Sequence, residues 1–207
     1  MLEDDGDRQY YLQWRLTEFM VAEDSIIELE RGEVAPDFSL PGTDGRTYSL
    51  ADFDNYEAVL LVFTCNHCPY AKAKFEALNR IAEDYDQVAV VGINPNDAEE
   101  YSEDSFDRMK DLVEDGTIQY DAYLRDESQD VARDYGAICT PDPFLLEAVN
   151  GEFHLAYHGR LDDALHHEEE PSGEPGFEMR AAIDNLLAGD PIEDEFKPSR
   201  GCSIKWK

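Results

Sequence analysis

The sequence has 207 residues, of which 42% are hydrophobic, so it can form one globular domain with a sizeable core. Its 48 acidic residues against 17 basic ones give a formal net charge of −31, which excludes nucleic acids and anionic membrane surfaces as favourable partners. Residues 1–13 lack the apolar segment of a secretory leader, and no run approaches membrane-spanning length, so we expect a cytoplasmic location.

The acidic residues are interleaved with core-forming residues along the whole chain rather than gathered in a tail. This distribution is similar to that of proteins from salt-accumulating halophiles. At molar salt the Debye length shortens to about 3 Å, and repulsion among the carboxylates is largely screened. A mesophilic protein with an acidic surface is the alternative interpretation.

The predicted elements begin after an acidic N-terminal extension at residues 1–31, which we expect to be partly disordered. From Gly32 onward the pattern changes. Phe38 and Leu40 alternate with polar residues, the segment 43–45 supplies turn residues, and alternation then resumes. The sequence therefore predicts a β-hairpin that leads into the core.

Residues 58–63 form an apolar run without alternation, which is typical of a central strand covered on both faces. A Cys-x-x-Cys pair, Cys65 and Cys68, follows this run, and apolar residues recur at helical spacing through 75–85. The pair therefore lies where a strand meets a helix. Pro69 is tolerated there because the first helical turn leaves its N–H groups unpaired. Those N–H groups and the helix dipole favour a thiolate at Cys65, with Cys68 as the resolving thiol.

Two thiols at this spacing can close a disulfide, but they can also form half of a zinc site. A zinc site needs further ligands, whereas Cys139 and Cys202 each stand alone, so we predict no metal. In a cytoplasmic protein such a pair is more often catalytic than structural. The chain has no phosphate-binding glycine motif, and no organic cofactor is expected.

The rest of the chain predicts an α/β order with antiparallel strands late. Strand–helix–strand order implies a right-handed parallel crossover, and an Asn-Gly turn at 150–151 indicates a hairpin. The predicted elements are strand 87–93, a helix that Ser102 caps and Gly116 ends, strand 123–124, a short helix that Ser128 caps, strands 144–147 and 153–157, a solvated loop at 162–176, and helix 177–187, which Gly189 ends. We predict one domain at 32–189 and a tail at 190–207.

This order of elements resembles the thioredoxin fold, and specifically the redoxin branch that includes the alkyl-hydroperoxide-reductase/thiol-specific-antioxidant (AhpC/TSA) family. Three stretches are specific: APDFSLPGTDGRTYSLADF at the predicted hairpin, the CNHC motif at 65–68, and Thr140-Pro141. The resemblance implies a three-layer α/β/α domain with a central mixed sheet and an N-terminal β-hairpin. It also implies that Pro141 is a cis-proline that faces the dithiol and presents backbone to an extended substrate.

The sequence departs from its relatives at two positions near the pair. Thr64 replaces the tryptophan that is usual before the dithiol of thioredoxins. The peroxidatic signature Pro-x-x-x-Thr-x-x-Cys is absent, because Val62 stands three residues before Cys65. Within the pair, Asn66 precedes His67, which occupies the slot of a histidine in strongly oxidising relatives. His67 either favours the thiolate, as there, or simply faces solvent.

Two further cysteines lie outside the motif. Cys139 should lie near the dithiol, but a free cysteine is commonly a small buried hydrophobe, and this interpretation is favoured. Cys202 lies on a tail that could fold back, and its GCSIKW ending resembles that of a subset of uncharacterised redoxins. A redox role for Cys202 is a hypothesis.

The sequence thus predicts a thiol-disulfide oxidoreductase with a role in antioxidant defence and redox homeostasis. Cys65 attacks a disulfide substrate, and Cys68 then displaces the product and closes a Cys65–Cys68 bond. Electrons come from a dithiol protein or a reductase. One alternative is a thiol-dependent peroxidase, in which Cys68 or Cys202 resolves a sulfenic acid at Cys65. Another is a non-catalytic protein that binds copper or zinc through Cys65, Cys68 and a histidine. The sequence specifies no oligomeric state.

Overall fold

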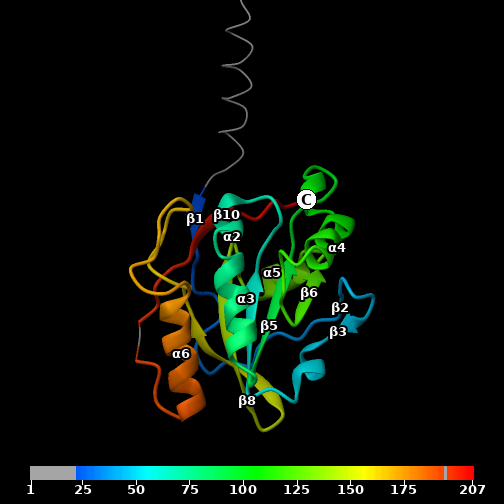
Figure 1. Ribbon diagram of the computed structural model, residues 1–207. Coiled ribbons are helices and arrows are strands. Elements are labelled where there is room, and N and C mark those ends of the chain that lie inside the picture. The colour runs from blue at the N-terminus through cyan, green and yellow to red at the C-terminus, as the bar shows by residue number, and fades with distance from the viewer. Residues whose placement is uncertain (1–21, 194) are drawn as a thin grey trace, which may run out of the picture.

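The protein is built on a five-stranded sheet in the order β6-β5-β4-β8-β9, seen in a computed structural model that describes residues 22–193 and 195–207 (Figure 1). Strands β4, β5 and β6 run parallel, whereas β8 and β9 are antiparallel to their neighbours. The predicted mixed sheet is confirmed. The strands are β4 (Ala58–Phe63), β5 (Val88–Asn94), β6 (Ala122–Arg125), β8 (Asp142–Val149) and β9 (Glu152–His158).

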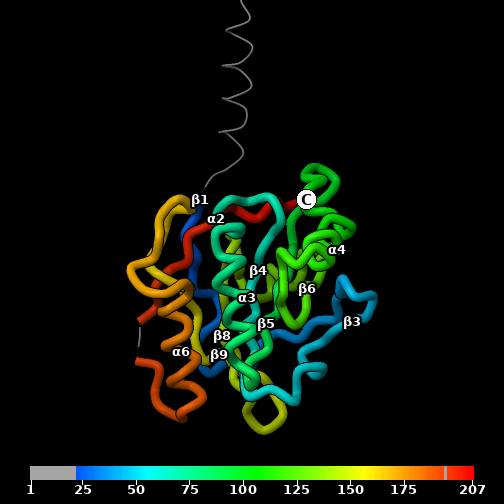
Figure 2. The backbone as a smooth tube through the Cα atoms, in the orientation of Figure 1, coloured from blue at the N-terminus to red at the C-terminus, as the bar shows by residue number. Residues whose placement is uncertain are grey.

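Helices cover both faces of this sheet, which is why every residue of β4 and β5 is buried. On one face, α3 (Phe75–Asp84) and α6 (Phe177–Ala188) pack their apolar side chains against Leu60 and Val90. On the other face lie α5 (Asp130–Asp134), the 3₁₀ helix η1 (Leu50–Phe53) and the hairpin of β2 (Leu40–Pro41) and β3 (Thr47–Tyr48). The chain path in Figure 2 shows the three layers of the predicted α/β/α domain.

Several helix starts differ from the prediction. The single helix expected after the cysteine pair is two helices, the four-residue α2 (Pro69–Lys72) and then α3. Ser102 begins a 3₁₀ helix, η2 (Ser102–Asp104), and the hydroxyl of Ser105 accepts the Arg108 N–H as the N-cap of α4 (Phe106–Glu114). Ser128 is also one residue early, because Gln129 precedes α5. Gly189, with φ of 71°, ends α6 as expected.

A second, three-stranded sheet joins both ends of the chain to the middle. Its order is β1 (Ala22–Asp24), β10 (Arg200–Ser203) and β7 (Cys139–Thr140), and all pairings are antiparallel. Figure 1 shows β1 and β10 beside α2 at one end of the molecule. The sequence placed β1 in the extension and β10 in the tail, whereas the structure packs both strands onto the domain. The boundaries at 31 and 189 stay predictions, and the expected disorder before residue 22 lies outside the described residues.

The loop at 162–176 is only partly the solvated excursion that the sequence predicted. Asp162 is buried, forms an ion pair with Lys74 and accepts the backbone N–H of Gly176 at 2.9 Å. Lys74 also donates to the carbonyl of Ala164. The glutamates that follow are all exposed. A buried carboxylate therefore anchors the start of this loop beside the linker between α2 and α3.

Within the described residues, no helix combines the length and the apolar character needed to cross a bilayer.

We propose that the protein is adapted to high salt, because its formal net charge is −31. Repulsion among the carboxylates disfavours the compact state in dilute buffer, and molar salt shortens the range of that repulsion to about 3 Å. We expect the melting temperature to rise steadily as KCl is added from near zero to molar concentration. Thermal melts followed by circular dichroism measure this. A melting temperature that stays flat or falls as KCl is added would contradict the proposed adaptation.

Candidate functional site

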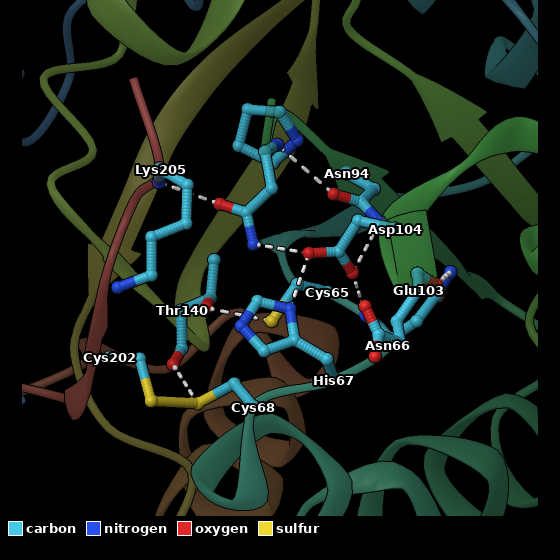
Figure 3. A network of polar contacts seen from close by, with 12 residues as sticks. Cys65, Asn66, His67, Cys68, Asn94, Glu103, Asp104, Thr140, Cys202 and Lys205 are labelled. Atoms are coloured by element: carbon cyan, nitrogen blue, oxygen red, sulfur yellow. Dashed lines mark hydrogen bonds and ion pairs between the residues drawn. A yellow bond between two sulfur atoms is a disulfide. The ribbon is translucent and has the colours of Figure 1, made fainter. Parts of the chain in front are cut away.

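The site begins at the carboxyl end of β4, where the chain turns towards α2. Cys65 follows this strand after one residue, Thr64, and Cys68 is the N-cap residue of α2. Both side chains are fully buried. Cys65 Sγ lies 3.2 Å from the hydroxyl oxygen of Thr140, and Cys68 Sγ lies 3.7 Å from the carbonyl oxygen of the same residue (Figure 3). The Thr140-Pro141 bond is cis, as predicted. Both sulfurs therefore contact Thr140, the residue that precedes the cis-proline.

Cys68 forms a disulfide with Cys202 rather than with Cys65, and their Cα atoms are 6.3 Å apart. Cys65 and Cys139 are free thiols. Strand β10 carries Cys202 to this place, because Cys202 is the Cα partner of Thr140 in the pairing with β7. The predicted Cys65–Cys68 bond is thus not the bond of this state, and the redox role of Cys202 stays a hypothesis.

A buried carboxylate, Asp104 at the end of η2, organises the polar side of the site. Its two oxygens accept four hydrogen bonds (Figure 3). The donors are the backbone N–H of Asn66 at 2.7 Å, Nδ2 of Asn94 at 3.3 Å, Nδ2 of Asn96 at 2.8 Å, and Nδ1 of His67 at 2.5 Å. Asp104 thereby fixes the segment between the two cysteines against the end of β5.

Sequence reasoning missed Asp104, although one signal could have indicated the region. Asn94 is the last residue of β5, the parallel neighbour of β4, and Asn96 follows two residues later. The carboxyl ends of parallel strands meet at the same edge of a sheet, so polar residues there face the cysteine pair. Asp104 itself lies beyond that edge, in a segment whose sequence resembles an ordinary acidic surface turn.

His67 does not simply face solvent, because 17% of its side chain is exposed. Besides its bond to Asp104, its ring stacks on Tyr101, with centroids 5.3 Å apart and an angle of 15° between the planes. Asn66 is also held, because the hydroxyl of Tyr123 donates to its Oδ1 at 2.7 Å. The two residues between the cysteines are therefore fixed in place by neighbours outside the motif.

The pKa of Cys65 is raised, whereas the sequence predicted that a thiolate is favoured at this position. Burial raises the pKa of Cys65 to about 12, and the negative charge of Asp104 adds to the rise. Hydrogen bonds lower the pKa of Cys65, as a helix N-terminus would, but they do not outweigh desolvation. They come from the Thr140 hydroxyl and from the backbone N–H groups of Cys68 and His67. The reason is geometric: α2 has four residues and begins after Cys68, so Cys65 lies outside it.

Asp104 stays ionised despite its burial. Burial alone would raise the pKa of Asp104, but the hydrogen bond and charge of His67, together with the bonds from Asn96 and Asn66, outweigh it and hold the pKa below its ordinary value. A carboxylate with this many donors is a stable negative charge beside Cys65.

Ligand atoms of Cys65, His67 and Asp104 all lie within 4.8 Å of one another, which is a set that could hold a metal ion. The donor chemistry fits poorly, however. Both oxygens of Asp104 are already occupied by hydrogen-bond donors, and Nδ1 of His67 is one of these. The hydrogen-bonded arrangement accounts for these groups without an ion.

The remaining predicted site residues surround the thiols. Thr64 is buried behind Cys65, with its N–H bonded to the carbonyl of Ile93 at 2.8 Å, and Pro69 opens α2. Cys139 is fully buried in β7 opposite Ser203, and burial holds the pKa of its thiol well above the ordinary value. These features agree with the favoured interpretation of Cys139 as a small buried hydrophobe, which stays a prediction.

A parallel strand that ends in Cys-x-x-Cys, opposite a cis-proline in a mixed sheet with helices on both faces, defines a thioredoxin-like protein of the redoxin type. The model of the AhpC/TSA family matches residues 31–157. The chain belongs to this family.

Comparison with known proteins gives the same fold and class. A crystal structure of an uncharacterized conserved protein from Geobacillus kaustophilus is 41% identical, covers 91% of this chain and 97% of its own, and superposes with a TM-score of 0.83. The thiol:disulfide interchange protein DsbE of Haemophilus influenzae is 28% identical over 122 residues, which are 59% of this chain and 62% of that protein. The thioredoxin-like protein YneN of Bacillus subtilis is 26% identical over 138 residues, or 66% of this chain and 76% of that protein.

Proposed function

We propose that this protein is a thiol-disulfide oxidoreductase in which Cys65 exchanges with disulfide substrates and Cys68 resolves the mixed disulfide. The observation that carries the proposal is the meeting of both sulfurs at Thr140, 3.2 Å and 3.7 Å from its oxygens, beside cis-Pro141. A thiolate at Cys65 attacks the substrate disulfide and releases one substrate thiol. Cys68 then attacks Cys65, releases the second substrate thiol and closes a Cys65–Cys68 bond.

The raised pKa of Cys65 fits one stage of this cycle. Burial and the charge of Asp104 keep the thiol protonated while Cys68 is bonded to Cys202. In that oxidised state Cys65 is protected from further oxidation, because the thiolate is the reactive form. Electrons from a dithiol donor then return the protein to the reduced state, in which Cys65 can react.

The peroxidase alternative is weaker. Val62 occupies the position where the peroxidatic signature has its threonine. Peroxide turnover is therefore expected to be slow relative to disulfide exchange in the same protein.

Mixed-disulfide trapping tests the assignment of the two thiols. The variants Cys68→Ser/Cys202→Ser and Cys65→Ser/Cys202→Ser each leave one thiol of the motif and remove Cys202, which could otherwise resolve the adduct. With oxidised glutathione, the first variant should accumulate one glutathionyl adduct on Cys65 by intact mass. The second variant should accumulate little, because Cys68 acts as the resolving thiol.

Cys139→Ser is the matched control, since it removes a buried free thiol that lies outside the motif. It should react as the wild type does. Equal adduct formation by the two trapping variants would contradict the proposed roles, and rapid consumption of hydrogen peroxide that depends on Cys65 would favour the peroxidase.

A further inference from the structure

We propose that Cys202 is a third redox-active residue, which receives the disulfide from the Cys65–Cys68 pair. The oxidised protein then carries Cys68–Cys202, and Cys65 is returned as a thiol. This inference rests on the proposed function and extends it, because the redox centre becomes a relay of three cysteines whose last member lies on the C-terminal strand β10.

The first observation is that Cys68 belongs to both pairs. It is the second cysteine of the motif, and it is the residue bonded to Cys202. A permanent Cys68–Cys202 bond would deprive Cys65 of its resolving thiol, and the motif would be chemically idle. A bond that forms and breaks in the cycle gives a use to all three residues.

The second observation is the close fit of β10 against the site. Cys202 lies opposite Thr140, whose atoms contact the sulfurs of both Cys65 and Cys68. At the preceding residue, a Cβ atom on Gly201 would lie 2.0 Å from the carbonyl oxygen of Thr140 and 2.9 Å from the nitrogen of Pro141. Only glycine permits this approach. Strand β10 therefore lies along the edge of β7, next to the cis-proline, and it carries Cys202.

The third observation is that β10 is held on both sides of Cys202 by bonds other than the disulfide. Before it, the hydroxyl of Ser199 donates to the carbonyl of Pro141 at 2.6 Å. After it, the N–H of Ile204 donates to the carbonyl of Ile138 at 2.8 Å. The backbone of Lys205 is fixed as well, since its N–H donates to Asn96 at 2.9 Å and its carbonyl accepts from Gln129 at 2.8 Å.

These anchors keep the Cys202 thiol near Cys68 when the bond is reduced. A thiol held in this way reacts at a high effective concentration, well above that of a free thiol in solution. No large movement is needed for the exchange, because Cys68 is the neighbour of both partners. The third step is therefore intramolecular and local.

The steps balance in atoms and electrons. Cys65 as thiolate attacks the substrate R–S–S–R′, forming Cys65–S–S–R and releasing R′–S⁻. Cys68 attacks Cys65 Sγ and releases R–S⁻. Cys202 attacks Cys68 Sγ, forms Cys68–Cys202 and releases Cys65 as thiolate, which takes up a proton. One substrate disulfide is reduced to two thiols, and one protein disulfide is formed. A dithiol protein that reduces Cys68–Cys202 completes the cycle.

Time-resolved disulfide mapping on the full chain tests the relay. The fully reduced protein is mixed with oxidised glutathione, quenched in acid, alkylated and digested, and each cysteine pair is quantified by mass spectrometry. In the wild type, Cys65–Cys68 should appear first and decay as Cys68–Cys202 rises. Cys202→Ser should stop at Cys65–Cys68 while releasing the same two equivalents of glutathione. In Cys65→Ser, Cys68–Cys202 should not form in the time that the wild type needs.

Three outcomes distinguish the possibilities. Formation of Cys68–Cys202 as fast in Cys65→Ser as in the wild type would overturn the relay and make the bond a structural staple. A wild type that stops at Cys65–Cys68 would also overturn it, with the proposed exchange intact. Failure of Cys202→Ser to consume oxidised glutathione or to form Cys65–Cys68 would instead contradict the proposed function. Cys139→Ser should follow the time course of the wild type.

Discussion

Replacing Asp104 with alanine is expected to lower the free energy of unfolding by about 3–5 kcal/mol. The carboxylate is fully buried and accepts bonds from Asn66, Asn94, Asn96 and His67. Its removal leaves these donors without an acceptor, and each buried donor left unsatisfied costs about 1–3 kcal/mol before the structure relaxes. Urea unfolding at neutral pH measures the loss.

Asp107→Ala is the matched control for this variant. Asp107 lies three residues further along, its side chain is 91% exposed, and its partner is Lys110 at 3.2 Å. An exposed pair of this kind contributes little, so this substitution should change the free energy of unfolding by no more than about 0.5 kcal/mol. A loss below about 1 kcal/mol for Asp104→Ala would show that the network around Asp104 is replaceable.

The pH dependence of stability gives the role of Asp104 a second readout. Its folded pKa lies below the ordinary value of 3.8. A carboxyl with a depressed folded pKa contributes stability above its unfolded pKa and loses it as the pH falls through the folded pKa. The stability gap between the wild type and Asp104→Asn should therefore be fully present at neutral pH and shrink below pH 3.8. Asp104→Asn should also lower the pKa of Cys65 below about 12, because one raising charge is gone.

Replacing Gly201 with valine is expected to displace β10 from the site. Its Cβ would lie 2.0 Å from the carbonyl oxygen and 2.4 Å from the carbonyl carbon of Thr140, and both are backbone atoms that cannot swing aside. The docked strand and the Cys68–Cys202 bond should be lost together. Loss of a disulfide that spans 134 residues typically costs about 2–5 kcal/mol. Disulfide mapping under air oxidation, denaturant unfolding and limited proteolysis of the tail measure the three effects.

Ser203→Ala is the control for the strand itself. Ser203 lies two residues from Gly201 in β10, and the substitution removes only a half-buried hydroxyl that accepts a hydrogen bond from Lys205 Nζ at 3.2 Å. The variant should keep the Cys68–Cys202 bond and the protection of the tail from protease. A Gly201→Val protein that still forms this bond in full yield would contradict the close fit of β10 to Thr140 as the reason for glycine at this position.

Features that depend on local sequence were predictable. The unbroken apolar run of β4 indicates a strand covered on both faces, and the change to helical spacing after it locates the cysteine pair at the strand end. The turn residues at 43–45 predict the hairpin of β2 and β3, and Gly189 ends α6 because a left-handed residue is needed there. Each of these features is set within about a dozen neighbouring residues, so the pattern alone carries it.

The helix starts mark the limit of this reasoning. Ser102 and Ser105 both have the side chain of an N-cap, and the sequence offers no reason to prefer one serine over the other. The structure selects Ser105, where the backbone is extended and the hydroxyl can accept the Arg108 N–H. The sequence pattern therefore predicts that these helices exist, and packing decides at which residues they begin.

The site shows most clearly which features the sequence predicts and which depend on the tertiary structure. By itself, the sequence pattern determined that Cys65 and Cys68 lie just after a buried strand, and the resemblance to the redoxin branch added the cis-proline before β8. Only the tertiary structure decided that Cys68 bonds to Cys202, because this contact depends on the register of β10 against β7. It also decided that the pKa of Cys65 rises, because burial and the charge of Asp104 come from segments distant in sequence and outweigh the local N–H groups.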